Sequence, residues 1–325
     1  MKKFNIFGAL AQLVEQWPFK PFVTGSNPVR PKILNFLLII LFSFSSQYTY
    51  ANDNILVQIT NHNDIVLNGN YLKHDHSDSV YLIVHGTRGF KGMEIINSLG
   101  MRIFDAGHDV LSINLSYGYS NRADSFLPCD IEHQHNEHDS VNEVILWYKY
   151  LLNKDYKNIS FVGHSRGGLN ILQASLLLDE RHNLYLLAPI IDTYEGTSQY
   201  YSEVHNLPYD EVINSSEEFI ISDRYPSINF LFCENADVSS KTFRSYLDFS
   251  SNIDMYPFTF NIIELLNDTK DMVTIFSGTD DEILLDSYKK IIGIKKLNIK
   301  HHIIEGGDHF FRDIYLDDVM EIMFE

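Results

Sequence analysis

Basic side chains are scarce in this chain of 325 residues. Lysines and arginines number 25 against 43 aspartates and glutamates, which gives a formal net charge of -18 at pH 7. Because such a field repels polyanions, the charge argues against nucleic acid and anionic membrane surfaces as partners. Hydrophobic residues nevertheless make up 45% of the sequence, enough for the core of a globular protein.

A hydrophobic run long enough to cross a membrane is also lacking. Residues 33–44 form a run of twelve nearly all-apolar residues, short of the roughly 20 that a membrane-spanning helix needs. Arg30 and Lys32 flank the run, and a small-x-small tripeptide ending at Ala51 follows it, an order typical of a secretory signal peptide. We therefore expect residues 1–51 to be a leader and the rest to be periplasmic or secreted. The alternative, an uncleaved anchor, would be the only contact with a membrane.

Only two cysteines are present, Cys129 and Cys233, and they do not form a Cys-x-x-Cys pair. Two are too few for a small protein built on disulfides, and their spacing does not fit a zinc site of that type. In an exported chain no third cysteine competes with them, so we expect a disulfide between them. Two buried thiols packed as small hydrophobes are the alternative.

From residue 52 onward, short apolar runs alternate with segments of helical period, which is typical of an α/β protein with a sheet flanked by helices. An antiparallel pair is expected first, and the run after it is apolar throughout, as in a strand buried on both faces. Ser140 and Glu143 are spaced as a capping box for a helix that would begin at Val141. The predicted strands cover residues 55–60, 65–72, 80–84, 110–115, 159–162, 184–187, 273–276 and 299–304, and the predicted helices cover residues 93–106, 141–152 and 169–178.

The strand rhythm stops between about residues 191 and 271, where Tyr, Phe, Ser and Asn are frequent. We predict that this segment is a mostly helical cap inserted into a single domain of residues 52–325. A disulfide from Cys129 to Cys233 would fasten this cap to the rim of the sheet. The aromatic side chains of the cap can line an apolar substrate pocket, although core packing explains such residues more often.

Residues 163–167 read Gly-His-Ser-Arg-Gly and match the pattern G-x-S-x-G. The pattern is weak by itself, but here it lies between a predicted strand and a predicted helix, the context of a nucleophilic serine. Small residues at 163 and 167 let strand and helix approach, and the strained turn would hold the Ser165 hydroxyl at the C-terminal end of the sheet. A phosphate-binding loop is the competing interpretation, but no Gly-Lys-Ser/Thr follows.

With this motif in its context, the chain resembles the α/β-hydrolase superfamily over roughly residues 55–323. The resemblance implies a mostly parallel central sheet flanked by helices. It also implies a catalytic acid and a histidine on loops after two late strands, in the chain order Ser, Asp, His. In such a triad the histidine accepts the serine proton, while the acid fixes the histidine tautomer and stabilises the imidazolium.

Both loops that the resemblance requires are found. The segment 277–283 looks like the family's G-x-x-D turn with Asp281 in the acid position, while Asp280 is the nearer alternative and Asp192 a minor one. The segment after the last predicted strand is similar to the family's G-x-x-H-F ending, which makes His309 the base. One histidine taken alone would be more often structural, but the three positions together favour a catalytic role.

The tripeptide His85-Gly86-Thr87 follows the predicted strand at residues 80–84. It resembles the family's HG turn, which supplies an amide to the oxyanion hole. By that resemblance, the donors would be the backbone N–H groups of Thr87 and Arg166, directed at the negative charge on the attacked carbonyl oxygen. We expect His85 itself to be structural.

The segment between the predicted strand at 110–115 and the next helix contains Cys129, His133, His135 and His138. Imidazole and thiolate suit zinc or copper, but the spacing matches no recognised zinc motif, and a serine triad needs no metal. We expect these side chains to pack within the loop. Contact with substrate is the alternative, because a loop after this strand lies at the same edge of the sheet as Ser165.

Together these features predict an exported serine hydrolase that cleaves an ester or related acyl bond of a small molecule through an acyl-enzyme, without a cofactor or metal. Carboxylesterase or lipase-like activity is the favoured subclass. A thioesterase, amidase or acyltransferase can use the same triad. A non-catalytic exported binding protein of the same fold is the alternative outside the enzymes.

The leader generates a first testable prediction. Residues 9–31 resemble the peptide translated from a bacterial transfer-RNA gene, which indicates that synthesis starts near residues 29–34. We expect the protein recovered from its native host to begin at or near Asn52, as measured by mass spectrometry of the intact chain. Recovery of peptides from residues 9–31 would contradict both the cleavage and the late start.

Overall fold

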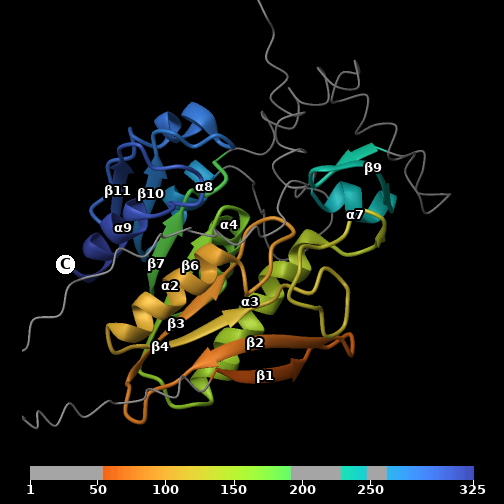
Figure 1. Ribbon diagram of the computed structural model, residues 1–325, viewed down its shortest axis with the longest axis horizontal. Coiled ribbons are helices and arrows are strands. Elements are labelled where there is room, and N and C mark those ends of the chain that lie inside the picture. The colour runs from red at the N-terminus through yellow and green to blue at the C-terminus, as the bar shows by residue number, and fades with distance from the viewer. Residues whose placement is uncertain (1–53, 192–227, 247–261) are drawn as a thin grey trace, which may run out of the picture. The chain divides into compact units, whose positions relative to one another are not determined.

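Eight strands form the central sheet of the structure, a computed structural model that describes residues 54–191, 228–246 and 262–325 (Figure 1). The order across the sheet is β1-β2-β4-β3-β6-β7-β10-β11. β2 pairs antiparallel with β1 and β4, and every other neighbouring pair is parallel. The strands are β1 (Ile55–Thr60), β2 (Val66–Leu72), β3 (Ser79–Val84), β4 (Asp109–Ile113), β6 (Asn158–His164), β7 (Asn183–Leu187), β10 (Met272–Gly278) and β11 (Ile299–Ile304). The prediction of a mostly parallel α/β sheet is therefore confirmed.

Helices cover both faces of the sheet, and the pleat of the strands divides the core in two. Along β3, Val80, Leu82 and Val84 pack on one side, while Tyr81 and Ile83 pack on the other. α3, α4 and α8 cover the first side, and α2 and α9 cover the second (Figure 1). These helices are α2 (Glu94–Asp105), α3 (Glu137–Leu152), α4 (Arg166–Ser175), α8 (Ile262–Asp268) and α9 (Ile314–Phe324). Within the described ranges, none is both long and apolar enough to cross a membrane.

The start of α3 differs from the sequence-based prediction. The helix begins at Glu137, and the Asp139 carboxylate accepts the backbone N–H of Asn136 at 3.0 Å. Ser140 and Glu143, the expected capping box, lie buried inside the helix. Glu143 instead accepts the backbone N–H of Ser116 at 2.8 Å, so it holds the loop after β4 rather than the helix end. The prediction was wrong because a tertiary partner takes the carboxylate that local spacing assigned to a cap.

The described part of the predicted cap contains strands as well as helices, and one of these helices, α8, packs on the main sheet. β8 (Ile228–Phe230), β9 (Cys233–Val238) and α7 (Ser240–Ser245) come from the insertion, and β5 (Glu132–His133) completes a small sheet of order β5-β9-β8. The sequence did not predict β8 and β9. The leader and residues 192–227 and 247–261 of the predicted insertion, including Asp192, lie outside the described residues.

Three aromatic side chains of the insertion, Phe230, Phe243 and Tyr246, are buried. The Phe230 and Tyr246 rings pack edge to face with their centroids 5.0 Å apart. These residues therefore contribute to the packing between the small sheet and α7, which is the more frequent of the two roles considered for them.

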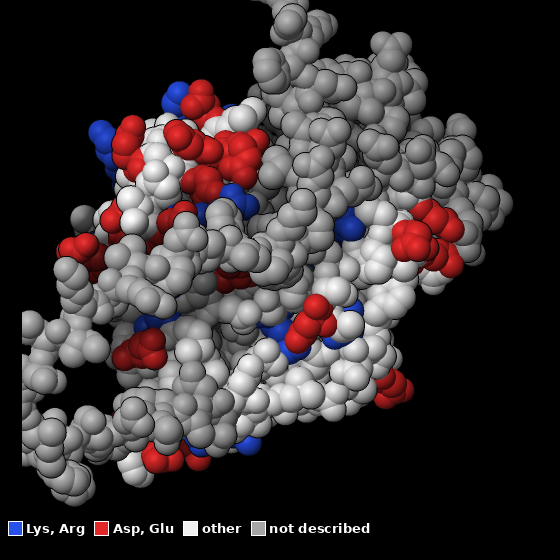
Figure 2. Space-filling view, in the orientation of Figure 1, with Lys and Arg blue, Asp and Glu red and all other residues white. Residues whose placement is uncertain are grey.

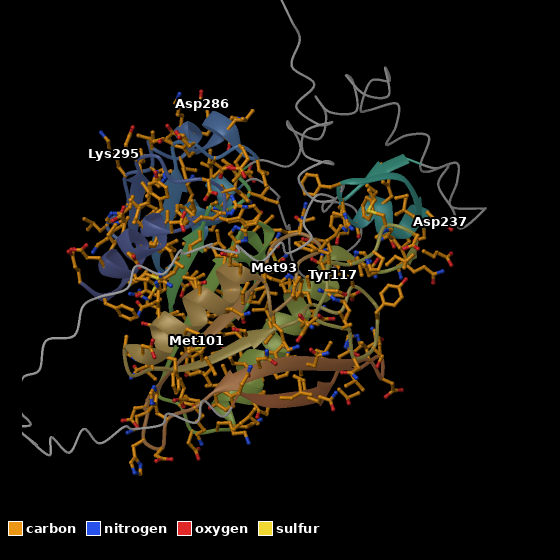
Figure 3. All side chains as sticks on the ribbon, in the orientation of Figure 1. Met93, Met101, Tyr117, Asp237, Asp286 and Lys295 are labelled. Carbon is orange, nitrogen blue, oxygen red and sulfur yellow. A yellow bond between two sulfur atoms is a disulfide. The ribbon has the colours of Figure 1, made fainter. Side chains whose placement is uncertain are left out.

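The structure contains the predicted disulfide between Cys129 and Cys233, with the two Cα atoms 5.2 Å apart (Figure 3). It joins the loop that follows β4 to the first residue of β9. Further along β9, β5 pairs with it in parallel, His133 lying opposite Val238. A covalent bond and a strand pair therefore fasten the described part of the insertion to the loop at the rim of the main sheet.

Acidic side chains gather over the C-terminal elements in the space-filling view (Figure 2). Asp313, Asp317, Asp318 and Glu321 are exposed on α9 and just before it. The negative charge of the sequence is thus partly concentrated on this face, where it would repel a polyanion.

The disulfide generates the second prediction. Its two cysteines are 104 residues apart in sequence, and a cross-link across so long a loop stabilises the folded state by roughly 2–4 kcal/mol. Replacing both cysteines, in Cys129→Ala/Cys233→Ala, should lower the free energy of unfolding by that amount in a denaturant titration. Parent protein treated with a reductant is the control. Equal unfolding midpoints for the oxidised parent and the double variant would contradict the prediction.

Candidate active site

Ser165 occupies the sharp turn between β6 and α4. Its backbone has φ 54° and ψ -121°, a conformation that is strained for any residue other than glycine. Two hydrogen bonds hold it there: the Ser165 N–H donates to the Leu187 carbonyl at 2.8 Å, and the Ser165 carbonyl accepts the Gly168 N–H at 3.0 Å. The strained serine therefore lies at the C-terminal end of β6, directly before the first turn of α4.

The glycines on either side of Ser165 permit this turn. A Cβ atom on Gly163 would lie 2.4 Å from the carbonyl oxygen of Gly167, and one on Gly167 would lie 2.4 Å from the carbonyl oxygen of Val84. Both distances are far below van der Waals contact, and the obstructing atoms belong to the backbone. Any side chain at these positions would push α4 away from β6 and from β3.

His309 and Asp281 form a buried pair on the loops after β11 and β10. The His309 Nδ1 and Asp281 Oδ2 atoms are 2.9 Å apart, and both side chains are at least 95% buried. The other carboxylate oxygen of Asp281 accepts the N–H groups of Ile283 at 2.9 Å and Leu284 at 2.7 Å. Asp280, the alternative acid, is exposed and pairs with the Thr279 hydroxyl at 3.3 Å. The structure thus brings Asp281, not Asp280, to His309.

The environment of Asp281 favours its charged form. Burial alone would raise the pKa of this carboxyl, but the hydrogen bond to His309 and the charge of that histidine act in the opposite direction. Together with the two backbone N–H donors, they lower the pKa of Asp281 below its ordinary value. A carboxylate that favours its charged form next to Nδ1 can stabilise the cation that an imidazole becomes when it accepts a proton.

His164 joins the serine turn to the histidine loop. Its Nε2 lies 3.0 Å from the His309 carbonyl oxygen, and the centroids of the two imidazole rings are 5.0 Å apart. Burial, followed by the charge of His309, lowers the pKa of His164 to about 3, so this ring stays neutral. The histidine next to Ser165 is therefore a structural link between the nucleophile turn and the loop of the candidate base. The motif G-x-S-x-G allows any residue at position 164, so it did not predict this role for His164.

The HG turn lies against Ser165. A Cβ atom on Gly86 would fall 2.9 Å from Cβ of Ser165, so only glycine allows this approach. The predicted donors Thr87 and Arg166 are also linked, because the Arg166 Nε donates to the Thr87 hydroxyl at 3.2 Å. His85 is fully buried, its Nε2 accepts the Leu115 N–H at 3.1 Å, and its Nδ1 lies 2.8 Å from the Gly86 carbonyl oxygen. These contacts give His85 the structural role expected for it.

The Arg166 side chain enters a buried ion pair that the sequence did not reveal. Its Nη1 lies 3.3 Å from an oxygen of Glu137, the first residue of α3, and Glu137 is fully buried. The same oxygen accepts a hydrogen bond from Asn170 at 3.0 Å, while the guanidinium lies 5.1 Å from the ring centroid of Tyr246. One side chain next to Ser165 thus connects α4, α3 and the insertion. An acidic residue at the start of a helix usually faces solvent, so nothing in the sequence marked Glu137.

The histidines of the loop after β4 pack against one another and against the insertion. His133 and His135 are both buried, and the His135 Nε2 lies 2.8 Å from the Tyr246 hydroxyl. Burial lowers the pKa of His133 to about 4 and that of His135 to about 3. His138 lies in the first turn of α3. No cluster of three or more His, Cys, Asp or Glu side chains suited to a metal occurs within the described residues. The contacts favour the packing role.

Neither a model of a known protein family nor a curated protein sequence matches this chain. Several solved structures are similar to it. Est1E from Butyrivibrio proteoclasticus, also solved with ferulic acid bound, is 16% identical over 83% of this chain and 97% of its own, with a TM-score of 0.58. The chain has the α/β-hydrolase fold. An esterase from Pyrococcus furiosus is 14% identical over 83% of this chain and 88% of its own, with a TM-score of 0.52. An alpha-beta serine hydrolase homologue from Coxiella burnetii is 11% identical over 83% of this chain and 95% of its own, with a TM-score of 0.51.

The two neighbouring aspartates generate the third prediction. Asp281→Asn removes the charge that pairs with His309, so we expect a loss of ester hydrolysis of roughly 10³- to 10⁴-fold, as when the acid of a triad is neutralised. Asp280→Asn is the matched control and should stay within about threefold of the parent, because Asp280 faces solvent. Steady-state kinetics on an activated ester measures both. A larger loss at Asp280 would reverse the assignment of the acid.

Proposed function

We propose that this chain is a serine hydrolase that cleaves a carboxylic ester, with Ser165 as nucleophile, His309 as general base and Asp281 as the acid that orients it. The observation that carries the proposal is the convergence of three loops. The strained turn at Ser165 is joined through His164 to the loop of His309, and His309 is paired with the buried carboxylate of Asp281. A core histidine needs no ionised partner, and a core serine needs no strained backbone.

In the first half of the reaction, the Ser165 Oγ attacks the ester carbonyl carbon while its proton passes to Nε2 of His309. The carbonyl oxygen becomes an oxyanion, which would be stabilised by the backbone N–H groups of Thr87 and Arg166. Collapse of this intermediate breaks the bond to the alcohol oxygen, and the alcohol leaves with the proton held by His309. The acyl group remains as an ester on Ser165.

In the second half, a water molecule replaces the alcohol. His309 takes a proton from this water as the water oxygen attacks the acyl carbon, and a second oxyanion forms in the same place. Its collapse releases the carboxylic acid and returns the proton to the Ser165 Oγ. Each cycle consumes one ester and one water and restores the side chains to their starting state.

The same residues can serve other acyl transfers. A thioester, an amide or an alcohol acceptor instead of water would make the chain a thioesterase, an amidase or an acyltransferase without any change in Ser165, Asp281 or His309. The esterases among the structural neighbours favour the ester. The acidic surface favours a small acyl substrate over a polyanionic partner. A binding protein that keeps the fold would have no use for an ionised acid on His309.

We further propose that the protein acts outside the cytoplasm, in the periplasm or beyond the cell. The signal-like segment at residues 33–51 and the disulfide between Cys129 and Cys233 support this compartment together. A disulfide that fastens the insertion would persist only where thiols are oxidised.

The nucleophile generates the fourth prediction. A fluorophosphonate probe should label the purified protein at Ser165, and Ser165→Ala should abolish the labelling and lower ester hydrolysis by roughly 10³-fold or more. Ser175→Ala, at the other end of α4, is the matched control, because the Ser175 hydroxyl only bonds the Leu172 carbonyl of its own helix. Labelling that survives in Ser165→Ala would refute the assignment of the nucleophile.

A panel of substrates then separates the subclasses. It should contain acyl esters of increasing chain length, a thioester and an anilide, together with a feruloyl ester, because Est1E binds ferulic acid. The ratio of kcat/KM values between ester and anilide distinguishes an esterase from an amidase. If the fluorophosphonate probe does not label the parent protein and the parent hydrolyses no member of the panel, the result would favour a non-catalytic binding protein of the same fold.

A further inference from the structure

The carbonyl oxygen of Gly86 lies within reach of three donors. His85 Nδ1 lies 2.8 Å from it, the Gly89 N–H donates at 3.0 Å, and the Tyr117 hydroxyl donates over a longer 3.5 Å. His85 Nδ1 carries its proton, because Nε2 of the same ring accepts the Leu115 N–H. This carbonyl belongs to the same peptide group as the Thr87 N–H, the proposed oxyanion donor. The three donors therefore act on the group that would bind the oxyanion.

Tyr117 contacts the peptide groups on both sides of Thr87. Its hydroxyl also accepts the backbone N–H of Arg88 at 3.1 Å, and that N–H belongs to the peptide that follows Thr87. The Tyr117 hydroxyl oxygen thus contacts both the peptide group before Thr87 and the one after it. Because Tyr117 comes from the loop after β4 (Figure 3), it ties the HG turn to a neighbouring loop.

The Tyr117 side chain is itself held firmly. Its backbone has φ 50°, an unfavourable conformation for an aromatic residue, which persists only where the surroundings impose it. The ring packs edge to face on His135 with centroids 5.1 Å apart, and the Arg122 guanidinium lies 5.2 Å from its centre. The hydroxyl is therefore presented to the HG turn from a fixed position.

The planarity of the peptide carries this constraint to the N–H. No described peptide bond is cis, so the Gly86 carbonyl and the Thr87 N–H point in opposite directions. Gly86 itself lies against Ser165, where no Cβ fits. Fixing the carbonyl on the side of His85 and Tyr117 fixes the direction of the N–H, and each donor on the carbonyl also strengthens that N–H as a donor.

We propose that Tyr117 is a positioning residue of the oxyanion hole: its hydroxyl holds the two peptide groups of Thr87, so that the Thr87 N–H points at the developing oxyanion before substrate arrives. The inference rests on the proposed serine hydrolase function. It extends that function by assigning a residue that does not touch the reacting atoms.

The protonation states fit this role. Burial raises the pKa of Tyr117 to about 12, and the negative charge of Glu137 adds to this effect against the opposing charge of Arg122. The phenol therefore keeps its proton near neutral pH. Burial, followed by the charge of Arg122, lowers the pKa of His85 well below its usual value, so that ring stays neutral and keeps one donor and one acceptor nitrogen.

Tyr117→Phe tests the proposal, because it removes the hydroxyl and keeps the ring. We expect kcat on an activated ester to fall about tenfold with KM within twofold of the parent. This loss is smaller than the roughly 10²- to 10³-fold loss seen when an oxyanion donor itself is deleted. The affinity for an alkyl boronic acid, which forms a tetrahedral anion on the serine, should fall by a similar factor. The affinity for the carboxylate product should not change. All rates are divided by the concentration of sites titrated with the fluorophosphonate probe, so that misfolded protein does not count.

Tyr119→Phe is the matched control. The Tyr119 hydroxyl lies two residues along the same loop and also donates to a carbonyl, that of Glu132 at 2.9 Å, but it does not reach the HG turn. Its kinetic constants should stay within twofold of the parent.

A kcat of Tyr117→Phe within twofold of the parent, a change confined to KM, or an equal loss in Tyr119→Phe would overturn the inference. If Ser165→Ala retains activity, the proposed function and the inference fail together. If Ser165→Ala is inactive while Tyr117→Phe matches the parent, only the inference fails.

Discussion

The close approach of α4 to the end of β3 is the constraint on which the rest of the site depends. Gly167 lies so near the carbonyl oxygens of Val84 and His85 that a Cβ atom there would fall 2.4 and 2.5 Å from them. This approach brings the turn after β6 and the turn after β3 into contact, because β3 and β6 are neighbouring parallel strands. Ser165 and the HG turn meet as a result. Asp281 and His309 come from the other side of β6, on the loops that follow β10 and β11.

Two buried ionic pairs surround this contact and differ in what they do. In the proposed reaction, the pairing of Asp281 with His309 would let a charge appear and disappear on the imidazole. Arg166 and Glu137 form a buried salt bridge, and such a pair gains little net stability because both groups lose their hydration. Removing one partner would nevertheless cost about 3–5 kcal/mol, since the other would remain buried and uncompensated. This pair therefore fixes where α3 and α4 meet more than it stabilises the fold.

The parts of the structure that depend on local pattern could be predicted from the sequence. The apolar run at residues 80–84 predicted a strand buried on both faces, and the glycines around Ser165 predicted the turn. The parts that depend on distant partners could not. Glu143 was assigned to a helix cap, but its carboxylate binds the backbone of Ser116. β9 was not predicted because four of its six residues, in the sequence Cys-Glu-Asn-Ala-Asp-Val, are of types depleted in strands. Its pairing partners in β5 and β8 are distant in sequence or short.

The disulfide also determines how the chain would respond to a protease. The segment between Cys129 and Cys233 contains residues 192–227 and every element from β5 to β8, including β6, α4 and β7. A cut within residues 192–227 would leave both fragments covalently joined. A cut within residues 247–261 would separate Ser165 from the fragment that carries Asp281 and His309, and only non-covalent contacts, chiefly the pairing of β7 with β10, would keep the fragments together. The disulfide thus keeps the two fragments joined after a cut within residues 192–227. After a cut within residues 247–261, no covalent bond would connect Ser165 to Asp281 and His309.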